Sequence, residues 1–462
     1  MSVAPTLPSS PDTDGLEQPR RFWAAVTLLL AIAVTVLDSS MANVALPSIA
    51  RSLGVDPAQV VWVVMAYNLV VVVSLLPLSA VAERIGFKRM YAAGMILLMI
   101  SSAAAAFSSS LTFLILARVF QGLASSMLMC LSGGLVRNIY PLRKLSQGIS
   151  FNAITVGVTA VLGPSLGAFI LQLASWPWIF WVVIPFGALS LLGVRYLPDV
   201  PRSSNERFDW IACGLSVLVF GLSLIGLDIL VKLPGWSLAC FVVVGVAGML
   251  LLRRSVQQTA PLLPIDLLRR IPVAYAVGAS FFSFAAQMSA FVSLPFYFQS
   301  VRHYAYADVG VLLGAWAVGV AVMAPLSSYL IRYFSIATLC AMGAGCMAVG
   351  ISTVLSLPLS VDFLWLMAAM LLGGIGFGFF QTPNNRALLT GAPKHRSGAA
   401  GGLQSITRVF GQGFGTALVS VVFTLAAAFG PTAGVMVAIA CAVIATLINI
   451  HRFFNPVPDL PA

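Results

Sequence analysis

The sequence predicts an all-α polytopic membrane protein with fourteen transmembrane helices. Three observations lead to this fold class: the composition, the length of the apolar runs and an internal repeat. Of 462 residues, 60% are hydrophobic and 8% are charged, against about 25% charged residues in an ordinary soluble domain. An aqueous fold could not bury this much apolar surface, so the class of soluble proteins is excluded.

The apolar runs recur at the length of roughly 20 residues that a bilayer core of about 30 Å requires. Each run should be a helix, because lipid offers no hydrogen-bond partner to an unpaired backbone group. The expected spans are residues 22–49, 57–80, 88–108, 111–138, 147–172, 177–197, 208–230, 236–253, 272–299, 306–331, 334–357, 361–383, 396–424 and 431–451.

The distribution of Lys and Arg predicts the orientation of these spans. With the N-terminus inside, the inner side carries twenty of the 25 Lys and Arg residues, and the outer side carries only Arg51, Lys232 and Arg302. The positive-inside rule then makes residues 1–21 and 453–462 cytoplasmic tails. The net charge of +11 is therefore a signal of topology in a lipid bilayer, and we expect no nucleic-acid partner.

Three short motifs recur along the chain at one spacing. The LP at Pro47 returns at Pro295, the PLS at Pro77 returns at Pro325, and the glycine-rich stretch from Val161 returns from residue 409, each 248 residues later. This repeat predicts two parallel six-helix bundles, 22–197 and 270–452, joined by linkers and two inserted helices in 198–269. In secondary transporters such bundles enclose a substrate site near the middle of the membrane and rock about it.

Two charged residues fall inside predicted spans at nearly the same depth. Asp38 lies about 23 Å from the inner end of the first span, and Arg118 lies about 9 Å from the outer end of the fourth, at 1.5 Å per residue. The two side chains could therefore pair. Either Asp38 gains and loses a proton as its access to water or to Arg118 changes, or the pair is a fixed structural contact between the two spans.

Two further ionisable residues lie within predicted spans. Asp228, near the outer end of the seventh span, is a secondary candidate, with capping or snorkelling at the interface as the alternative. Arg408, deeper in the thirteenth span, has no evident acidic partner in sequence and either meets anionic groups of a substrate or bonds helix-end carbonyls.

Polar side chains scattered through the spans suggest a wet central cavity, although each alone could equally form an interhelical hydrogen bond. The candidates are Asn43, Tyr67, Asn68, Gln121, Asn152, Gln287, Gln381 and Gln404. The six cysteines lack metal-ligand spacing and the chain has no phosphate-binding loop, so we expect no metal, no cofactor and no enzyme activity. Energy must then come from an ion gradient.

Several stretches resemble the major facilitator superfamily. LSAVAERIGFKR (78–89) is similar to its loop signature G-x-x-x-D-R-x-G-R-K, with Ser79 and Glu83 in place of Gly and Asp. LILARVFQGLASS (114–126) resembles the motif of its fourth helix, TAVLGPSLGA (159–168) its antiporter motif, and SWPWIFWVVIPFG (175–187) the start of its sixth helix. LDSSMANVALP and the count of fourteen spans resemble the drug:proton antiporter branch, the EmrB/QacA type.

This resemblance implies roles for particular residues. The cytoplasmic loop would act as a latch between the halves through Glu83, Arg84, Gly86, Lys88 and Arg89. For the two arginines and the lysine, positive-inside charge is the alternative. Gly163, Pro164 and Gly167 would form the antiporter motif, where small side chains and a missing backbone donor allow close helix approach and a bend.

The resemblance also implies the function. We expect export of amphipathic, cationic organic compounds by proton antiport with alternating access across a bacterial inner membrane. Export of a specific metabolite or siderophore, or proton-coupled uptake, is the alternative. The short stretch between the last two spans argues against a periplasmic adaptor, and we expect a monomer whose partners are a small-molecule substrate and protons.

Overall fold

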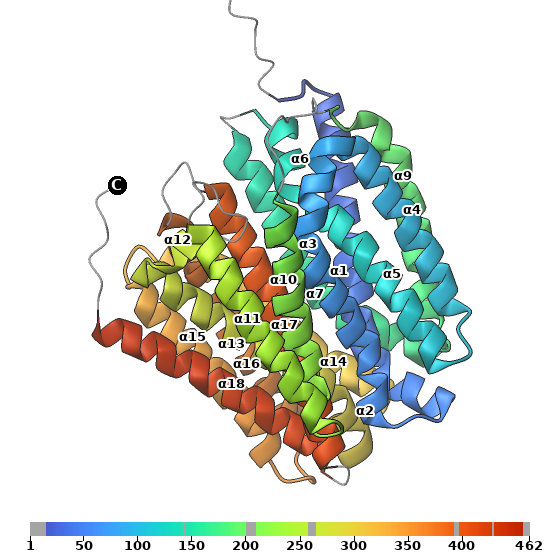
Figure 1. Ribbon diagram of the computed structural model, residues 1–462. Helices are drawn as coiled ribbons and strands as arrows, with labels where there is room; N and C mark the ends of the chain where they lie inside the picture. The colour runs from blue at the N-terminus through green and yellow to red at the C-terminus, as the bar shows by residue number, and fades with distance from the viewer. Residues whose placement is uncertain are drawn as a thin grey trace, which may run out of the picture.

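The protein is a bundle of long helices (Figure 1). The structure, a computed structural model, describes residues 15–141, 144–199, 209–256, 265–391, 397–426 and 429–455, and no strand occurs among them. Fourteen helices in these ranges are long and apolar enough to cross a membrane. The predicted fold class and the number of spans are confirmed.

The first six predicted spans are present, three of them as segmented helices. Span 57–80 is divided into α2 and α3, span 111–138 into α5 and α6, and span 177–197 into α8, α9 and η2. The elements are α1 (Arg20–Leu53), α2 (Pro57–Val60), α3 (Trp62–Ile85), α4 (Phe87–Ala106), α5 (Leu111–Met129), α6 (Ser132–Ile139), α7 (Leu145–Leu173), α8 (Trp178–Trp181), α9 (Val183–Leu192) and η2 (Gly193–Tyr196).

The remaining eight spans follow with one short helix between them. The elements are α10 (Trp210–Asp228), α11 (Pro234–Val256), α12 (Ile265–Leu268), α13 (Ile271–Phe296), η3 (Tyr297–Val301), α14 (Tyr306–Leu330), α15 (Ile336–Ser356), α16 (Phe363–Thr390), α17 (Ser397–Leu425) and α18 (Gly430–Phe454).

Local sequence signals set several helix ends. Ser110, Asp209 and Ser335 precede α5, α10 and α15, and each side chain accepts a hydrogen bond from a backbone N–H in the first turn. Such caps satisfy donors that the helix itself leaves unpaired. At the other end of α1, Gly54 adopts a left-handed conformation with φ of 64°, which glycine reaches without strain.

The periphery of the bundle is apolar, as a lipid environment requires. On α11, Leu238, Val242, Val246 and Leu250 recur every four residues and are 65%, 58%, 57% and 48% exposed. One face of α11 is thus a continuous row of exposed apolar side chains. Exposing such a row is unfavourable in water and favourable in lipid.

The helices pack as two groups with a helical hairpin beside them. In the first group α1 packs on α7, α3 on α5, and α4 on α5 and α9; in the second α13 packs on α17 and α18, α14 on α16, and α15 on α16 and α18. The hairpin of α10 and α11 meets both groups, because α10 contacts α3 and α17. This grouping is compatible with the predicted halves, whose exact boundaries stay a prediction.

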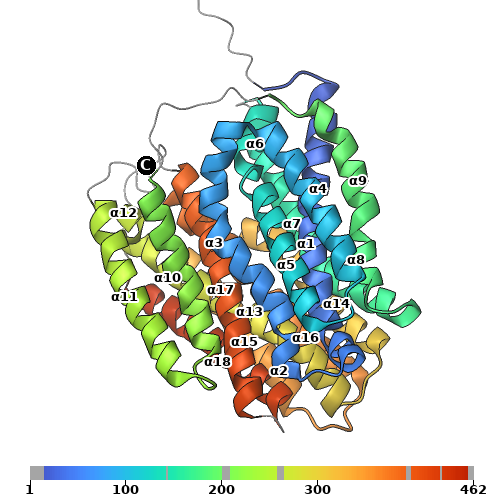
Figure 2. The ribbon, with the colours of Figure 1, turned by 45° about the vertical axis from the view of Figure 1, so that its right-hand side comes forward.

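Side-chain contacts join the two groups near the end of the bundle that carries α2, which lies opposite the start of α1 (Figure 2). Ser165 of α7 donates to the carbonyl of Gly310 in α14 at 3.3 Å. Arg51, near the end of α1, donates to Gln299 Oε1 at 2.6 Å and also to the hydroxyl of Tyr306 at the start of α14. The two groups are therefore joined at the α2 end.

Glycine permits the closest helix contact in the second group. A Cβ atom added to Gly374 of α16 would collide with the backbone carbonyl of Trp316 in α14, and neither backbone can yield locally. We expect Gly374→Ala to lower the thermal stability of the purified protein clearly, since overpacking costs about 1–3 kcal/mol. The melting temperature in detergent, read by size-exclusion chromatography after heating, measures the effect.

Gly245 in α11 provides the matched control. An added Cβ there meets no atom within 4 Å, so Gly245→Ala should leave the melting temperature unchanged or raise it slightly through helix propensity. Equal melting temperatures for the two variants would contradict the close α14–α16 packing.

Candidate functional site

A cluster of polar side chains lies buried where α1, α4 and α5 meet. Asp38 from α1, Ser102 from α4, and Arg118 and Gln121 from α5 are each 0% exposed. Arg118 and Gln121 stand three residues apart, so they project from the same face of α5. Because charged groups are expensive inside a membrane, such a cluster is a candidate functional site.

Asp38 and Arg118 form an ion pair. Arg118 Nη1 donates to Asp38 Oδ2 at 2.9 Å, and Gln121 Nε2 donates to Asp38 Oδ1 at 3.1 Å. Both carboxylate oxygens therefore accept hydrogen bonds from α5. The contact predicted from the depths of Asp38 and Arg118 is present, because the fixed rise of a helix places them at the same level.

The guanidinium of Arg118 is held from several sides. Its Nε donates to the carbonyl of Val63 in α3 at 3.0 Å, and its central carbon lies 4.3 Å from the ring centre of Tyr67 and 5.8 Å from that of Phe180. At these distances the rings attract the cation. The remaining nitrogen, Nη2, has no hydrogen-bond partner among the described residues, so one donor stays available for a new acceptor.

Such a pair constrains the helices more than it stabilises the fold. Removing one partner of a buried pair costs about 3–5 kcal/mol because the other charge is left uncompensated, whereas an apolar replacement of both is often neutral. The pair therefore fixes α1 against α5 for as long as both groups are charged.

The glycines of α7 bring that helix close to α1 beside Asp38. A Cβ atom added to Gly163 would collide with Ser40, and one added to Gly167 would lie 3.1 Å from Cα of Met41. Pro164, between the two glycines, is buried. The expected close approach is present, and the neighbouring helix is α1.

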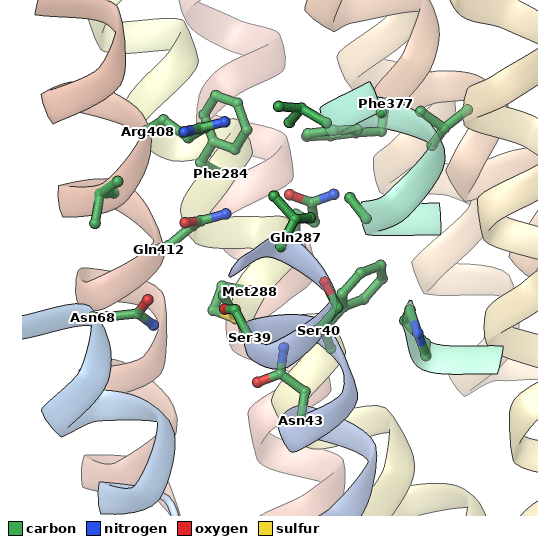
Figure 3. Close-up of a pocket in the computed structure, with 18 of the residues that line it drawn as sticks. Ser39, Ser40, Asn43, Asn68, Phe284, Gln287, Met288, Phe377, Arg408 and Gln412 are labelled. Carbon is green, nitrogen blue, oxygen red and sulfur yellow. The ribbon is translucent and has the colours of Figure 1, made fainter. Parts of the chain in front are cut away.

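A central cavity lies beside this cluster, between the two groups of helices. The cavity has a volume of about 130 Å³. Figure 3 shows side chains from α1, α3, α13, α16 and α17 around it. One part of its wall is apolar and carries Phe284, Met288, Phe291, Trp316 and Phe377.

Five of the eight predicted cavity residues line this space. They are Asn43, Tyr67, Asn68, Gln287 and Gln381. Gln121 instead belongs to the ion-pair cluster, because it shares its helix face with Arg118. Asn152 of α7 and Gln404 of α17 are not among the described lining residues, and the type of residue alone does not reveal which polar side chains reach the cavity.

Tyr67 connects the cavity to the ion pair. Its ring lines the cavity and also lies over the guanidinium of Arg118 at 4.3 Å. One aromatic side chain thus separates a molecule in the cavity from the Asp38–Arg118 pair. If a molecule in the cavity displaced Tyr67, the surroundings of the ion pair would change. If Arg118 moved and displaced Tyr67, the cavity wall would change.

The two secondary candidates have different surroundings. Asp228 is 4% exposed and accepts a hydrogen bond from Ser420 Oγ of α17 at 2.5 Å. The alternative of a carboxylate snorkelling to the interface is therefore wrong, because the side chain turns inward and ties α10 to α17. Arg408 lines the cavity.

The loop between α3 and α4 contains the predicted latch. Gly86 ends α3 with φ of 93°, Arg84 lies over the ring of Trp210 with its central carbon 5.6 Å from the ring centre, and Lys88 Nζ lies 3.7 Å from Asp199. These partners belong to the start of α10 and the segment after η2. Arg89 is exposed, and the side chain of Glu83 lies outside the described part of the structure.

Four polar cavity residues were not predicted from the sequence, and Thr35, one turn before Ser39 on α1, is the first of them. Ser39 and Ser40 follow Asp38 directly, and Gln412 follows Arg408 by four residues on α17. The spacing of four places Gln412 on the face of Arg408, and this signal could have identified it.

The described residues contain no group of three or more His, Cys, Asp or Glu side chains that could hold a metal ion. The site instead offers an ion pair, amide and guanidinium donors and an aromatic wall. Groups of these kinds can bind an organic molecule, and a carboxylate can bind a proton.

Several known proteins are similar in sequence to this chain over most of its length. The Major Facilitator Superfamily profile matches residues 28–416. Uncharacterized transporter YebQ of Escherichia coli (strain K12) is 39% identical over 447 residues, which cover 96% of this chain and 98% of that protein. Riboflavin transporter RibZ of Clostridioides difficile (strain 630) is 26% identical, with 87% and 88% covered. Multidrug export protein EmrB of Escherichia coli (strain K12) is 28% identical, with 86% and 79% covered.

Solved structures share the fold. The crystal structure of peptide transporter POT in complex with sulfate matches with a TM-score of 0.70 over 94% of each chain at 16% identity. The relatives' names describe different solutes, so the property they share is transport. With a profile match over most of its length and a relative 39% identical across nearly all of it, this chain belongs to the major facilitator superfamily of membrane transporters.

Proposed function

We propose that this protein is a secondary active transporter that exports amphipathic organic compounds in exchange for protons. One observation carries this proposal: a buried carboxylate, Asp38, is paired with Arg118, and Tyr67 connects that pair to a central cavity. A carboxylate can bind and release a proton, and a cavity between two helix groups can hold a solute. The two sites are separated by a single side chain.

The contacts suggest how a proton would be coupled to the solute. While Asp38 is ionised, it holds Arg118 at 2.9 Å. A proton on Asp38 removes the charge that Arg118 faces and weakens the attraction between α1 and α5. Arg118 can then move with respect to Tyr67, and the cavity wall moves with it. Binding of a solute against Tyr67 would act on the pair in the reverse direction, because such coupling is reciprocal.

The proposed topology assigns a facing state to the structure. The excess of Lys and Arg at the ends of the spans favours a cytoplasmic start of α1. The α2 end, where Arg51 and Ser165 join the two helix groups, then faces outward and is closed. Glu83, Arg84, Gly86, Lys88 and Arg89 would act as a cytoplasmic latch in the opposite state.

We further propose an inner-membrane monomer that works without a periplasmic adaptor. Only residues 426–429 connect α17 to α18, which leaves no outer domain there to engage one. Gly163, Pro164 and Gly167 would serve the exchange by letting α7 slide on α1.

The alternative is a transporter for one metabolite or siderophore, working by export or by proton-coupled uptake. Arg408 in the cavity wall favours this alternative, since a single guanidinium selects its ligand more narrowly than an aromatic wall does. The relative named riboflavin transporter shows that a defined solute occurs among related proteins.

Asp38→Asn should abolish proton-coupled export while the protein still inserts and folds. Asparagine keeps the shape of the side chain but neither binds nor releases a proton near neutral pH. Cells preloaded with ethidium, a cation, or with 8-anilinonaphthalene-1-sulfonate, an anion, should lose dye faster when they express the wild type. Fluorescence after energisation measures the rate, and the variant should fall to the rate of cells without the protein.

Asp209→Asn is the matched control, because it removes a carboxylate at the start of α10, away from the cavity, and keeps a capping oxygen. Its efflux rate should equal that of the wild type. Undiminished efflux by Asp38→Asn, or no efflux of either dye by the wild type, would count against the proposal.

The pair itself can be tested by a double-mutant cycle. Asp38→Asn and Arg118→Gln should each destabilise the protein, while the double variant loses less than the sum, with a coupling energy of about 2 kcal/mol. Reversible unfolding by SDS in mixed micelles measures the three changes. The same cycle on Asp209 and Arg254, 2.6 Å apart but partly exposed, should give a much smaller coupling. Additive effects at Asp38 and Arg118 would show that no pair forms.

A further inference from the structure

The charge inside the cavity comes from one residue. Among the described lining residues, Arg408 alone is charged at neutral pH, and none is Asp or Glu. Its guanidinium, whose charge is delocalised over three nitrogens, stays protonated in proteins. Asp38 and Arg118 lie outside the lining set and neutralise each other at 2.9 Å. The cavity therefore carries one uncompensated positive charge.

Arg408 differs from an arginine that caps a helix in the same chain. Arg302 donates to the carbonyls of Val354, Leu357 and Pro358 at the end of α15, at 3.2, 2.7 and 3.0 Å. Arg408 has no hydrogen-bond or ion-pair partner among the described residues. Bonding to helix-end carbonyls, one of the two roles considered for Arg408 from its sequence, is thus not what the structure shows.

Neutral donors surround the same space. Gln412 lies one turn from Arg408 on α17, and Figure 3 shows both side chains extending into the space that Gln287 reaches from α13. The indole N–H of Trp316 and the amide nitrogen of Asn68, both in the wall, have no acceptor among the described residues. Buried donors normally have partners. The amide oxygen of Asn43 in the wall likewise has no donor among the residues described. Two donors and a cation against this one acceptor suit an acceptor-rich ligand.

The rest of the wall fits an aromatic body. Phe291 and Phe377 each lie against Trp316, with ring centres 5.7 and 6.5 Å apart, and Phe284 lies 5.5 Å from Phe377. These rings present faces and edges to which another flat apolar group can add. Met288 beside them is adaptable in shape.

We propose that the cavity binds amphipathic aromatic carboxylates, with the carboxylate on Arg408 and the ring among Phe284, Trp316 and Phe377. The carboxylate of the ligand supplies the negative charge that the cavity wall lacks. A guanidinium can bind a carboxylate through two parallel hydrogen bonds. This inference rests on the proposed function for its transport role, and it replaces the cationic substrates expected from the sequence. Binding itself needs no transport.

Three probes test this proposal: 4-phenylbutanoate, 4-phenylbutanamide and 4-phenylbutylammonium. They share a phenyl ring on a four-carbon chain and differ in the charge of the end group. Calorimetric titration of the full-length protein in detergent at neutral pH, without any gradient, gives a Kd for each. We expect the carboxylate to bind at least about tenfold more tightly than the other two, the factor for roughly one charge-assisted contact. Arg408→Gln should remove this preference and Arg408→Lys should retain part of it.

Arg253→Gln is the matched control, because it removes an exposed cation on α11 outside the cavity. It should bind all three probes as the wild type does. Equal or tighter binding of the ammonium probe by the wild type, a preference for carboxylate that survives in Arg408→Gln, or binding of none of the probes would overturn the proposal.

The same titration separates this inference from the proposed function. Asp38→Asn should keep the preference for carboxylate, since Asp38 is not a lining residue. Proton-coupled dye export without a carboxylate preference would leave the proposed function standing and reject only the ligand class. A carboxylate preference with export that survives in Asp38→Asn would reject proton coupling through Asp38 and keep the ligand class.

Discussion

The buried pair of Asp38 and Arg118 is the constraint on which the arrangement of the first helix group depends. Two charges in a membrane interior are tolerated only when each compensates the other. To achieve this, α1 and α5 must present them at one depth, and α3 must supply the carbonyl of Val63. The close contact of α7 with α1 at Gly163 places a further helix against α1 beside this pair. A proton on Asp38 would release the one contact that holds these helices by charge.

The pair and the cavity are adjacent but chemically distinct. The pair is fully buried, whereas the cavity wall combines amides, aromatic rings and one cation. Tyr67 belongs to both, because one ring meets Arg118 and the cavity. This arrangement keeps the group that titrates away from direct contact with a solute, so many solutes could use the same proton site. Changes in the cavity wall would alter what is bound without altering how binding is coupled.

Much of the fold follows from the sequence, because helix length and rise are fixed by the bilayer and the backbone. The rise per residue of a helix is enough to predict that Asp38 lies level with Arg118. The helix rise does not give the rotation of each helix about its axis, and the incorrect site predictions have this cause. Gln121 faces the ion pair, Asn152 and Gln404 do not line the cavity, and Asp228 turns inward to Ser420. Gln412 was not predicted, although its spacing of four residues from Arg408 places both on one face of α17.

The sign of the charge in the cavity decides which gradient would drive exchange. A monocation exported against one entering proton moves no net charge, so only the pH difference contributes. A monoanion exported against one proton moves two charges in the favourable electrical direction when the cell interior is negative. The membrane potential then adds about 2.3 kcal/mol per charge per 100 mV. Under the two proposals, Arg408 therefore does more than select a ligand: by accepting anions, it places the exchange under the membrane potential as well as the pH gradient.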